Sequence, residues 1–116
     1  MKRIVMAGAL AATTALMLFA GAASARHEAT TVGVKMSEFK FVLTTKTVAK
    51  GVVTFKLSNV GTIPHDFKIN GKKTPLVAPK QSATLKLTFI KAGKYPYICT
   101  VPGHAAAGMK GVLTVR

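Results

Sequence analysis

Cysteine is almost absent from this chain, in which Cys99 is the single thiol among 116 residues. One cysteine cannot close an internal disulfide, so the disulfide scaffold of many small exported domains is excluded. Cys99 therefore pairs with another chain, lies inert in the core, or binds a ligand. Acids are also scarce, with three Asp and Glu residues against 17 Lys and Arg residues, which leaves a formal net charge of +14.

Residues 1–25 predict a cleaved secretory signal peptide, and residues 26–116 the mature domain. Two basic residues precede an apolar run over residues 4–20, and an A-x-A cleavage signal ends at Ala25. An uncleaved membrane anchor is the alternative, but the apolar run is short for a spanning helix. We therefore expect a periplasmic protein of one modest domain, without stable membrane insertion after cleavage.

The excess of basic residues is spread along the mature chain rather than gathered in one cluster. A basic surface this even favours an acidic protein partner or an anionic membrane surface. Nucleic acid is not expected as a partner, because no pattern of stacking aromatics accompanies the lysines and the chain carries an export signal.

Helical periodicity is missing after the signal peptide, except that residues 105–107 can form a single turn stopped by Gly108. Apolar and polar residues instead alternate with period two, which is typical of half-buried antiparallel strands. The alternating or strand-like runs are residues 31–36, 52–59, 82–89, 95–99 and 111–115. Turn signals such as Asn70-Gly71 separate them. The sequence therefore predicts an all-β, Greek-key β-sandwich.

Three side chains that bind soft metals lie at the end of the fourth of these runs and in the loop after it, in the stretch "YPYICTVPGHAAAGMKGVLTV". They are Cys99, His104 and Met109. A thiolate, an imidazole and a thioether together suit a copper ion that cycles between Cu(I) and Cu(II). The blue-copper arrangement has two histidines and one cysteine in a trigonal set, with a long axial methionine, so a second histidine is required.

Histidine is rare as well, and the mature chain offers only His27 and His65 besides His104. His65 follows a turn and opens the next strand, whereas His27 lies two residues from the predicted N-terminus. A lone buried cysteine is more often a small apolar side chain than a ligand. The combination of donors in the segment around His65 and in the segment 99–109 nevertheless favours a site for one copper ion. Its predicted ligands are His65, Cys99, His104 and Met109.

The stretches "IPHDF" and "YPYICTVPGHAAAGMKGVLTV" resemble the cupredoxins, the blue-copper family of plastocyanin, pseudoazurin, amicyanin and rusticyanin. The resemblance extends from Val32 to Val115, and the four predicted ligands fall on the family's ligand positions. His104 follows Cys99 by five residues, where plastocyanin and pseudoazurin have three, so the spacing looks more like that of rusticyanin. Asp66 stands where plastocyanin-like members carry Asn.

The resemblance and the donor set together lead us to expect a mobile one-electron carrier that is not an enzyme. Its partners are expected to be redox proteins with an acidic docking surface, and the protein to be a monomer. A copper scavenger or chaperone is the alternative, although such sites are typically exposed and rich in Met or His. Copper oxygenases of the His-brace type require His as the first mature residue, and multicopper oxidases require more domains and more histidines.

Two finer expectations concern the surroundings of the site. The Asp66 carboxylate is expected to accept hydrogen bonds from Thr100, which would tie the two ligand segments together. Small residues flank His104, namely Gly103 and the alanines at 105–107. One edge of the His104 ring is therefore expected near the surface, within a small apolar patch through which electrons enter.

Overall fold

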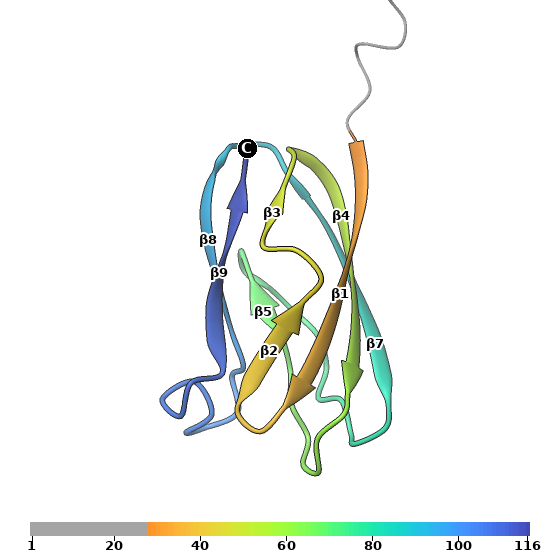
Figure 1. Cartoon of the computed structure of the whole chain (residues 1–116), viewed down its shortest axis with the longest axis vertical. Coiled ribbons are helices and arrows are strands. Elements are labelled where there is room, and N and C mark those ends of the chain that lie inside the picture. The colour runs from red at the N-terminus through yellow and green to blue at the C-terminus, as the bar shows by residue number, and fades with distance from the viewer. Residues whose placement is uncertain (1–27) are drawn as a thin grey trace, which may run out of the picture.

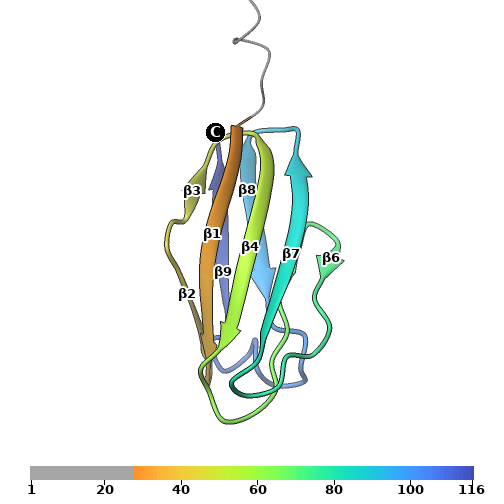
Figure 2. The same cartoon turned by 90° about the vertical axis from the view of Figure 1, so that its right-hand side faces the viewer.

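The computed structural model describes residues 28–116, which form two β-sheets packed face to face (Figures 1 and 2). The predicted signal peptide, its cleavage site and His27 lie outside the described residues. Within residues 28–116 the structure contains strands, turns and bends but no helix. The predicted all-β sandwich is therefore confirmed.

Nine strands make up the two sheets. The first sheet has the order β2 (Lys40–Leu43), β1 (Glu28–Ser37), β4 (Gly51–Asn59) and β7 (Ser82–Phe89). The second sheet has the order β3 (Thr47–Val48), β9 (Lys110–Val115), β8 (Gly93–Ile98), β5 (Lys68–Ile69) and β6 (Lys72–Lys73).

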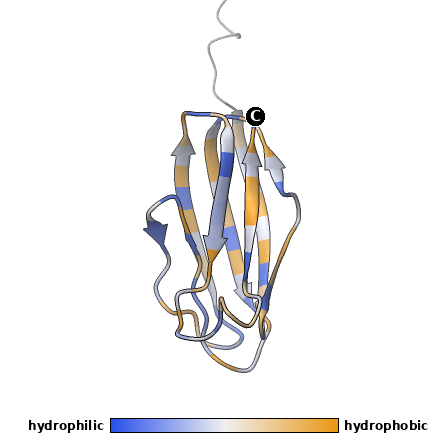
Figure 3. Ribbon diagram, turned by 90° about the vertical axis from the view of Figure 1, so that its left-hand side faces the viewer, coloured by the Kyte–Doolittle hydropathy of each residue, from blue (hydrophilic) through white to orange (hydrophobic). Residues whose placement is uncertain are grey.

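The core lies between the sheets and follows the alternation in the sequence. Along β4, Val53, Phe55 and Leu57 are buried, while Lys56 between them is exposed. Figure 3 shows the same alternation of hydrophobic and hydrophilic residues along the long strands. Burying one such apolar side chain contributes about 1.5–3 kcal/mol, so these strands supply much of the driving force for the sandwich.

Strand pairing differs from the sequence expectation in one respect. The alternation suggested antiparallel strands, but β1 pairs with β4 in parallel, and so does β3 with β9. The chain leaves β1 through β2, crosses to the second sheet at β3, and returns to the first sheet as β4. Period-two alternation reports which face of a strand is buried and does not report the direction of its neighbour.

The loops that carry the predicted ligands lie at the end of the sandwich opposite the C-terminus (Figure 1). The turn between β1 and β2, the loop after β4 and the loop between β8 and β9 all reach this end. Residues far apart in the sequence therefore meet there. Among residues 28–116, no helix is long and apolar enough to cross a membrane.

Candidate metal centre

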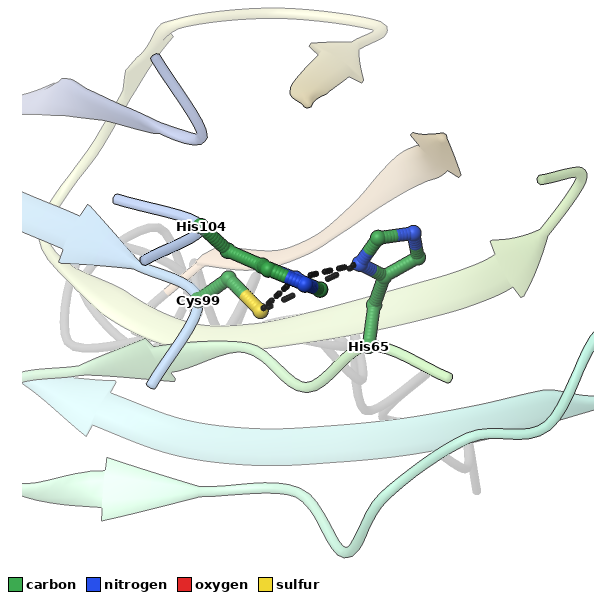
Figure 4. A group of neighbouring side chains, drawn as sticks. All are labelled: His65, Cys99 and His104. Atoms are coloured by element: carbon green, nitrogen blue, oxygen red, sulfur yellow. Dashed lines mark hydrogen bonds between the residues drawn. The ribbon is translucent and has the colours of Figure 1, made fainter. Parts of the chain in front are cut away.

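Three of the four predicted ligands converge on one point inside the sandwich. The Nδ1 atoms of His65 and His104 lie 3.1 Å apart, and the Cys99 Sγ atom is 3.6 Å from His104 Nδ1 and 4.0 Å from His65 Nδ1 (Figure 4). All three side chains are buried, with exposed fractions of 0% for His65, 1% for Cys99 and 8% for His104. Residues 65 and 99, which are 34 positions apart in the sequence, thus lie side by side in the fold.

The spacing of these three atoms fits a single metal ion. By comparison with zinc, an ion bound at about 2.0 Å from nitrogen and about 2.3 Å from sulfur separates trigonal donors by about 3.5–3.8 Å. The observed separations of 3.1 to 4.0 Å bracket this range. The types of donor atom fit a metal ion as well, because two ring nitrogens and one sulfur point toward the same position.

His65 is held by main-chain hydrogen bonds on both sides. Its N–H donates to the Val77 carbonyl at 3.2 Å, and the Val77 N–H donates to the His65 carbonyl at 2.8 Å. The buried side-chain amide of Asn59 donates to the carbonyls of Ile63 at 2.9 Å and Val77 at 2.8 Å. From the sequence, Asn59 has no role beyond the end of a strand-like run, but its side chain holds the segment that presents His65.

Cys99, His104 and Met109 are joined by their own loop. The Cys99 N–H donates to the Met109 carbonyl at 3.1 Å, and the Met109 N–H donates to the His104 carbonyl at 3.0 Å. The Gly108 N–H donates to the Ala105 carbonyl at 3.0 Å, and Gly108 has a φ of +119°, so the predicted single turn forms and ends there. The structure thus brings Met109 to the other three through its main chain and buries its side chain completely.

Asp66 joins the two ligand segments, as predicted. The Thr100 N–H donates to Asp66 Oδ1 at 2.6 Å, and the Thr100 hydroxyl donates to Asp66 Oδ2. Asp66 directly follows His65, and Thr100 directly follows Cys99. A shift of either ligand segment would therefore break two hydrogen bonds that join the segments.

Glu38 is a neighbour of the site that sequence reasoning missed. Its Oε1 atom accepts from the N–H of Thr62 at 2.8 Å and of Ile63 at 3.0 Å, and lies 3.2 Å from His65 Nε2. The Thr62 N–H above all lowers the pKa of Glu38 to about 2, so the carboxylate is ionised at neutral pH. The only signal in the sequence was that Glu38 is one of three acids in a basic chain.

Burial also acts on the thiol. It raises the pKa of Cys99 above its ordinary value, so the free thiol holds its proton. A metal ion displaces that proton, since the thiolate is the ligand form of cysteine. Binding of a cation beside Cys99 therefore favours the thiolate over the thiol.

His104 is the most accessible of the four predicted ligands. Its exposed fraction is 8%, against 1% or less for the other three. Phe39 lies edge-on against the His104 ring, with ring centroids 5.0 Å apart, and is itself 40% exposed. Ala106 and Ala107 beside it are exposed as well. The predicted apolar patch is present, and Phe39 is a member of it that the sequence did not reveal.

A β-sandwich with a His-Cys-His cluster at one end defines a class of small proteins with a soft metal site. A family model described as Cupredoxin-like domain matches residues 9–115. The chain therefore belongs to the cupredoxin family, as its motifs indicated.

Two curated relatives carry the same name, copper-resistant cuproprotein CopI. The protein of Pseudomonas aeruginosa is 51% identical over 41 residues, which are 35% of this chain and 23% of the relative. The protein of Rubrivivax gelatinosus is 33% identical over 110 residues, with 74% of this chain and 66% of the relative covered. The chain thus spans less than two thirds of the length of either relative.

Solved structures of blue copper proteins share the fold. Auracyanin B is 23% identical with a TM-score of 0.64, covering 75% of this chain and 88% of its own. Auracyanin A from Chloroflexus aurantiacus is 21% identical with a TM-score of 0.63, and the match covers 77% of this chain and 100% of auracyanin A. The blue copper oxidase from Nitrosomonas europaea is 20% identical with a TM-score of 0.64, covering 77% of this chain but 39% of its own.

The donor chemistry and the family lead to the same cofactor. A cysteine, two histidines and a buried methionine from one end of a sandwich are the donor set that suits a copper ion. One copper ion is therefore the cofactor that this site and this family support.

Proposed function

We propose that the protein is a periplasmic blue-copper protein that acts as a mobile one-electron carrier, with His65, Cys99, His104 and Met109 as ligands. The observation that carries this proposal is the buried convergence of two Nδ1 atoms and one Sγ atom within 4.0 Å. Copper held there supplies a one-electron couple between Cu(I) and Cu(II).

The chain's part in this function is to hold the donors still. Main-chain bonds between His65 and Val77, and from Cys99 to Met109, keep both ligand segments in place. Asp66 and Thr100 link the segments to each other. Donors that do not move between oxidation states keep the reorganisation on electron transfer small, and burial keeps water away from the metal.

Electron exchange at the His104 edge is supported by its accessibility and by the small side chains around it. A partner can approach closely over Phe39, Ala106 and Ala107, which are exposed and uncharged. Two exposed lysines are adjacent in the sequence to this region: Lys40 follows Phe39, and Lys110 follows Met109. Their positive charges would attract an acidic partner. We therefore propose a redox protein with an acidic docking surface as the partner, and a monomeric carrier.

Copper handling is the second candidate, and the name of the CopI relatives favours it. A protein that passes copper on needs a site that a partner's ligands can reach. The burial of all four predicted ligands argues for retention of the ion instead. A protein that retains copper can still protect against it, so the two candidates differ in whether electrons pass through the site.

An enzymatic function receives no support from the described residues. Within residues 28–116 the group of His65, Cys99 and His104 is the one cluster of His, Cys, Asp or Glu side chains that can hold a metal. Multicopper oxidases need further copper sites and further domains, and the oxidase that shares this fold is far longer. We propose that the protein is not an enzyme.

The proposal is tested on the exported, processed protein loaded with Cu(II). We expect an intense blue absorption from charge transfer between the Cys99 thiolate and Cu(II), and rapid electron exchange with a reduced redox protein. Cys99→Ser should lose the blue band completely, because the transition needs the thiolate. A colourless copper complex in the unaltered protein would instead favour copper handling, and a blue Cys99→Ser variant would overturn the ligand assignment.

A further inference from the structure

Glu38 contacts the outer edge of the His65 ring, on the side that faces away from the metal site. Its Oε1 atom lies 3.2 Å from His65 Nε2, while His65 Nδ1 faces Cys99 and His104. His65 is fully buried, whereas the Glu38 side chain retains 27% exposure. The carboxylate therefore reaches inward from the turn between β1 and β2 to a ring that has no contact with solvent.

This contact determines which nitrogen of His65 carries the proton. A carboxylate oxygen only accepts hydrogen bonds, so Nε2 must be the protonated atom of the neutral ring. Nδ1 is then left with its lone pair directed at the metal site.

The loop after β4 leaves room for the carboxylate. A Cβ atom added at Gly61 would lie 2.6 Å from Glu38 Oε1 and 2.7 Å from Oε2, which is closer than a Cβ atom approaches other atoms in folded proteins. The N–H groups of Thr62 and Ile63, which follow Gly61, both donate to Oε1. Glycine at this position thus allows the loop to close over the carboxylate.

We propose that Glu38 is a positioning residue of the metal centre: its carboxylate, seated against Gly61, holds His65 with Nε2 protonated and Nδ1 directed at the metal, and biases the bound ion toward its higher oxidation state. The second half of this proposal rests on the copper function proposed above. Glu38 is not a ligand, because it contacts the nitrogen that points away from the site.

The bias follows from charge. A carboxylate that accepts the Nε2 proton makes the imidazole a stronger donor, as outer partners of metal-bound histidines do. A negative charge near the site also stabilises Cu(II) more than Cu(I), because Cu(II) carries one more positive charge. Removal of the carboxylate should therefore weaken Cu(II) binding more than Cu(I) binding and raise the reduction potential.

The tautomer is measured first, in the metal-free full chain, by nitrogen NMR of the histidine rings at about pH 8, where free imidazole is neutral. We expect the unaltered protein to show His65 protonated at Nε2 only. Glu38→Ala removes the acceptor and should give a mixture of both tautomers. Glu38→Gln retains a carbonyl acceptor and should retain most of the Nε2 tautomer, although its charge is lost.

Gly61→Ala provides an independent test that leaves Glu38 in the chain. The new methyl group would displace the carboxylate, which lies at the end of a flexible side chain and can move without unfolding the loop. The tautomer should shift as in Glu38→Ala. Val60→Ala, at an exposed residue of the same loop, is the matched control and should leave the His65 tautomer unchanged.

The potential is measured next on the copper-loaded variants. In Glu38→Gln the preference for Cu(II) over Cu(I) should fall by about tenfold, which corresponds to a rise of about 59 mV in the one-electron potential. Thr88→Lys adds the same unit of charge at an exposed position of β7 and should leave the potential close to that of the unaltered protein.

The outcomes separate this proposal from the copper function. If Glu38→Ala and Gly61→Ala lower the melting temperature but change neither the tautomer nor the potential, Glu38 only braces the loop and the proposal is overturned. If the unaltered protein binds no copper but its His65 tautomer follows Glu38, the copper function fails while the positioning of His65 stands.

Discussion

Asp66 and Thr100 are joined by a hydrogen bond of 2.6 Å from the Thr100 N–H to Oδ1, between residues 34 positions apart. Each of the two residues directly follows a predicted ligand in the sequence. The bond therefore determines how far the His65 segment lies from the Cys99 segment. The relative position of the predicted ligands therefore depends on contacts between the two loops, and not on either loop alone.

Asp66→Ala should weaken copper binding by about tenfold and destabilise the apoprotein by about 1–3 kcal/mol. The reason is that the N–H of Thr100 loses its acceptor and the two ligand segments lose their link. Copper competition and thermal unfolding provide the measurements. Asp66→Asn retains one acceptor oxygen, and its copper affinity and stability should lie between those of the unaltered protein and those of Asp66→Ala. Unchanged copper affinity and potential in Asp66→Ala would refute the role of this link.

Met109→Gln should keep copper bound but change its reduction potential. The methionine is expected to be the weak axial ligand, which tunes the potential more than it holds the ion. Protein-film voltammetry gives the potential, and the blue band reports that Cys99 remains bound. Met36→Gln is not a suitable comparison because Met36 is a fully buried core residue. Loss of all copper from Met109→Gln would show that the methionine holds the ion instead.

Ala106→Glu should slow electron exchange with an acidic redox partner by about tenfold or more at low salt, because it adds bulk and a repelling charge to the patch beside His104. Ala106→Lys adds the bulk with an attracting charge and should slow exchange less. Stopped-flow mixing measures both rates, and the copper spectrum should not change. Exchange in the unaltered protein should also slow as ionic strength rises. Rates indifferent to both the substitutions and salt would place electron entry elsewhere.

Gly111→Ala should destabilise the sandwich by about 1–3 kcal/mol through overpacking. Gly111 in β9 lies directly opposite Tyr97 in β8, and a Cβ atom there would overlap the hydroxyl and ring of Tyr97. The fully buried ring cannot move outward without opening the core beneath the site. Chemical denaturation measures the loss, and Val112→Ala at an exposed neighbour is the control. Equal stability of the two variants would contradict the close approach of Tyr97.

Much of the fold follows from the alternation of residues along the chain. Val53, Phe55 and Leu57 predicted an inward face of β4, and all three are buried. The ligand types were equally readable, because few side chains bind soft metals and this chain has few of them. Asp66 and Thr100 could be paired in advance because each directly follows a predicted ligand.

The tertiary structure decided what alternation and residue type leave open. The parallel pairing of β1 with β4 depends on the path of the chain between the sheets, which a period of two residues does not encode. The contact of Glu38 with His65 spans 27 positions and arises because two loops meet at one end of the sandwich. Phe39 reaches His104 for the same reason. Sequence alone determined which donors exist and which faces are buried, whereas folding selected their neighbours, because contacts across distant loops depend on how the whole chain packs.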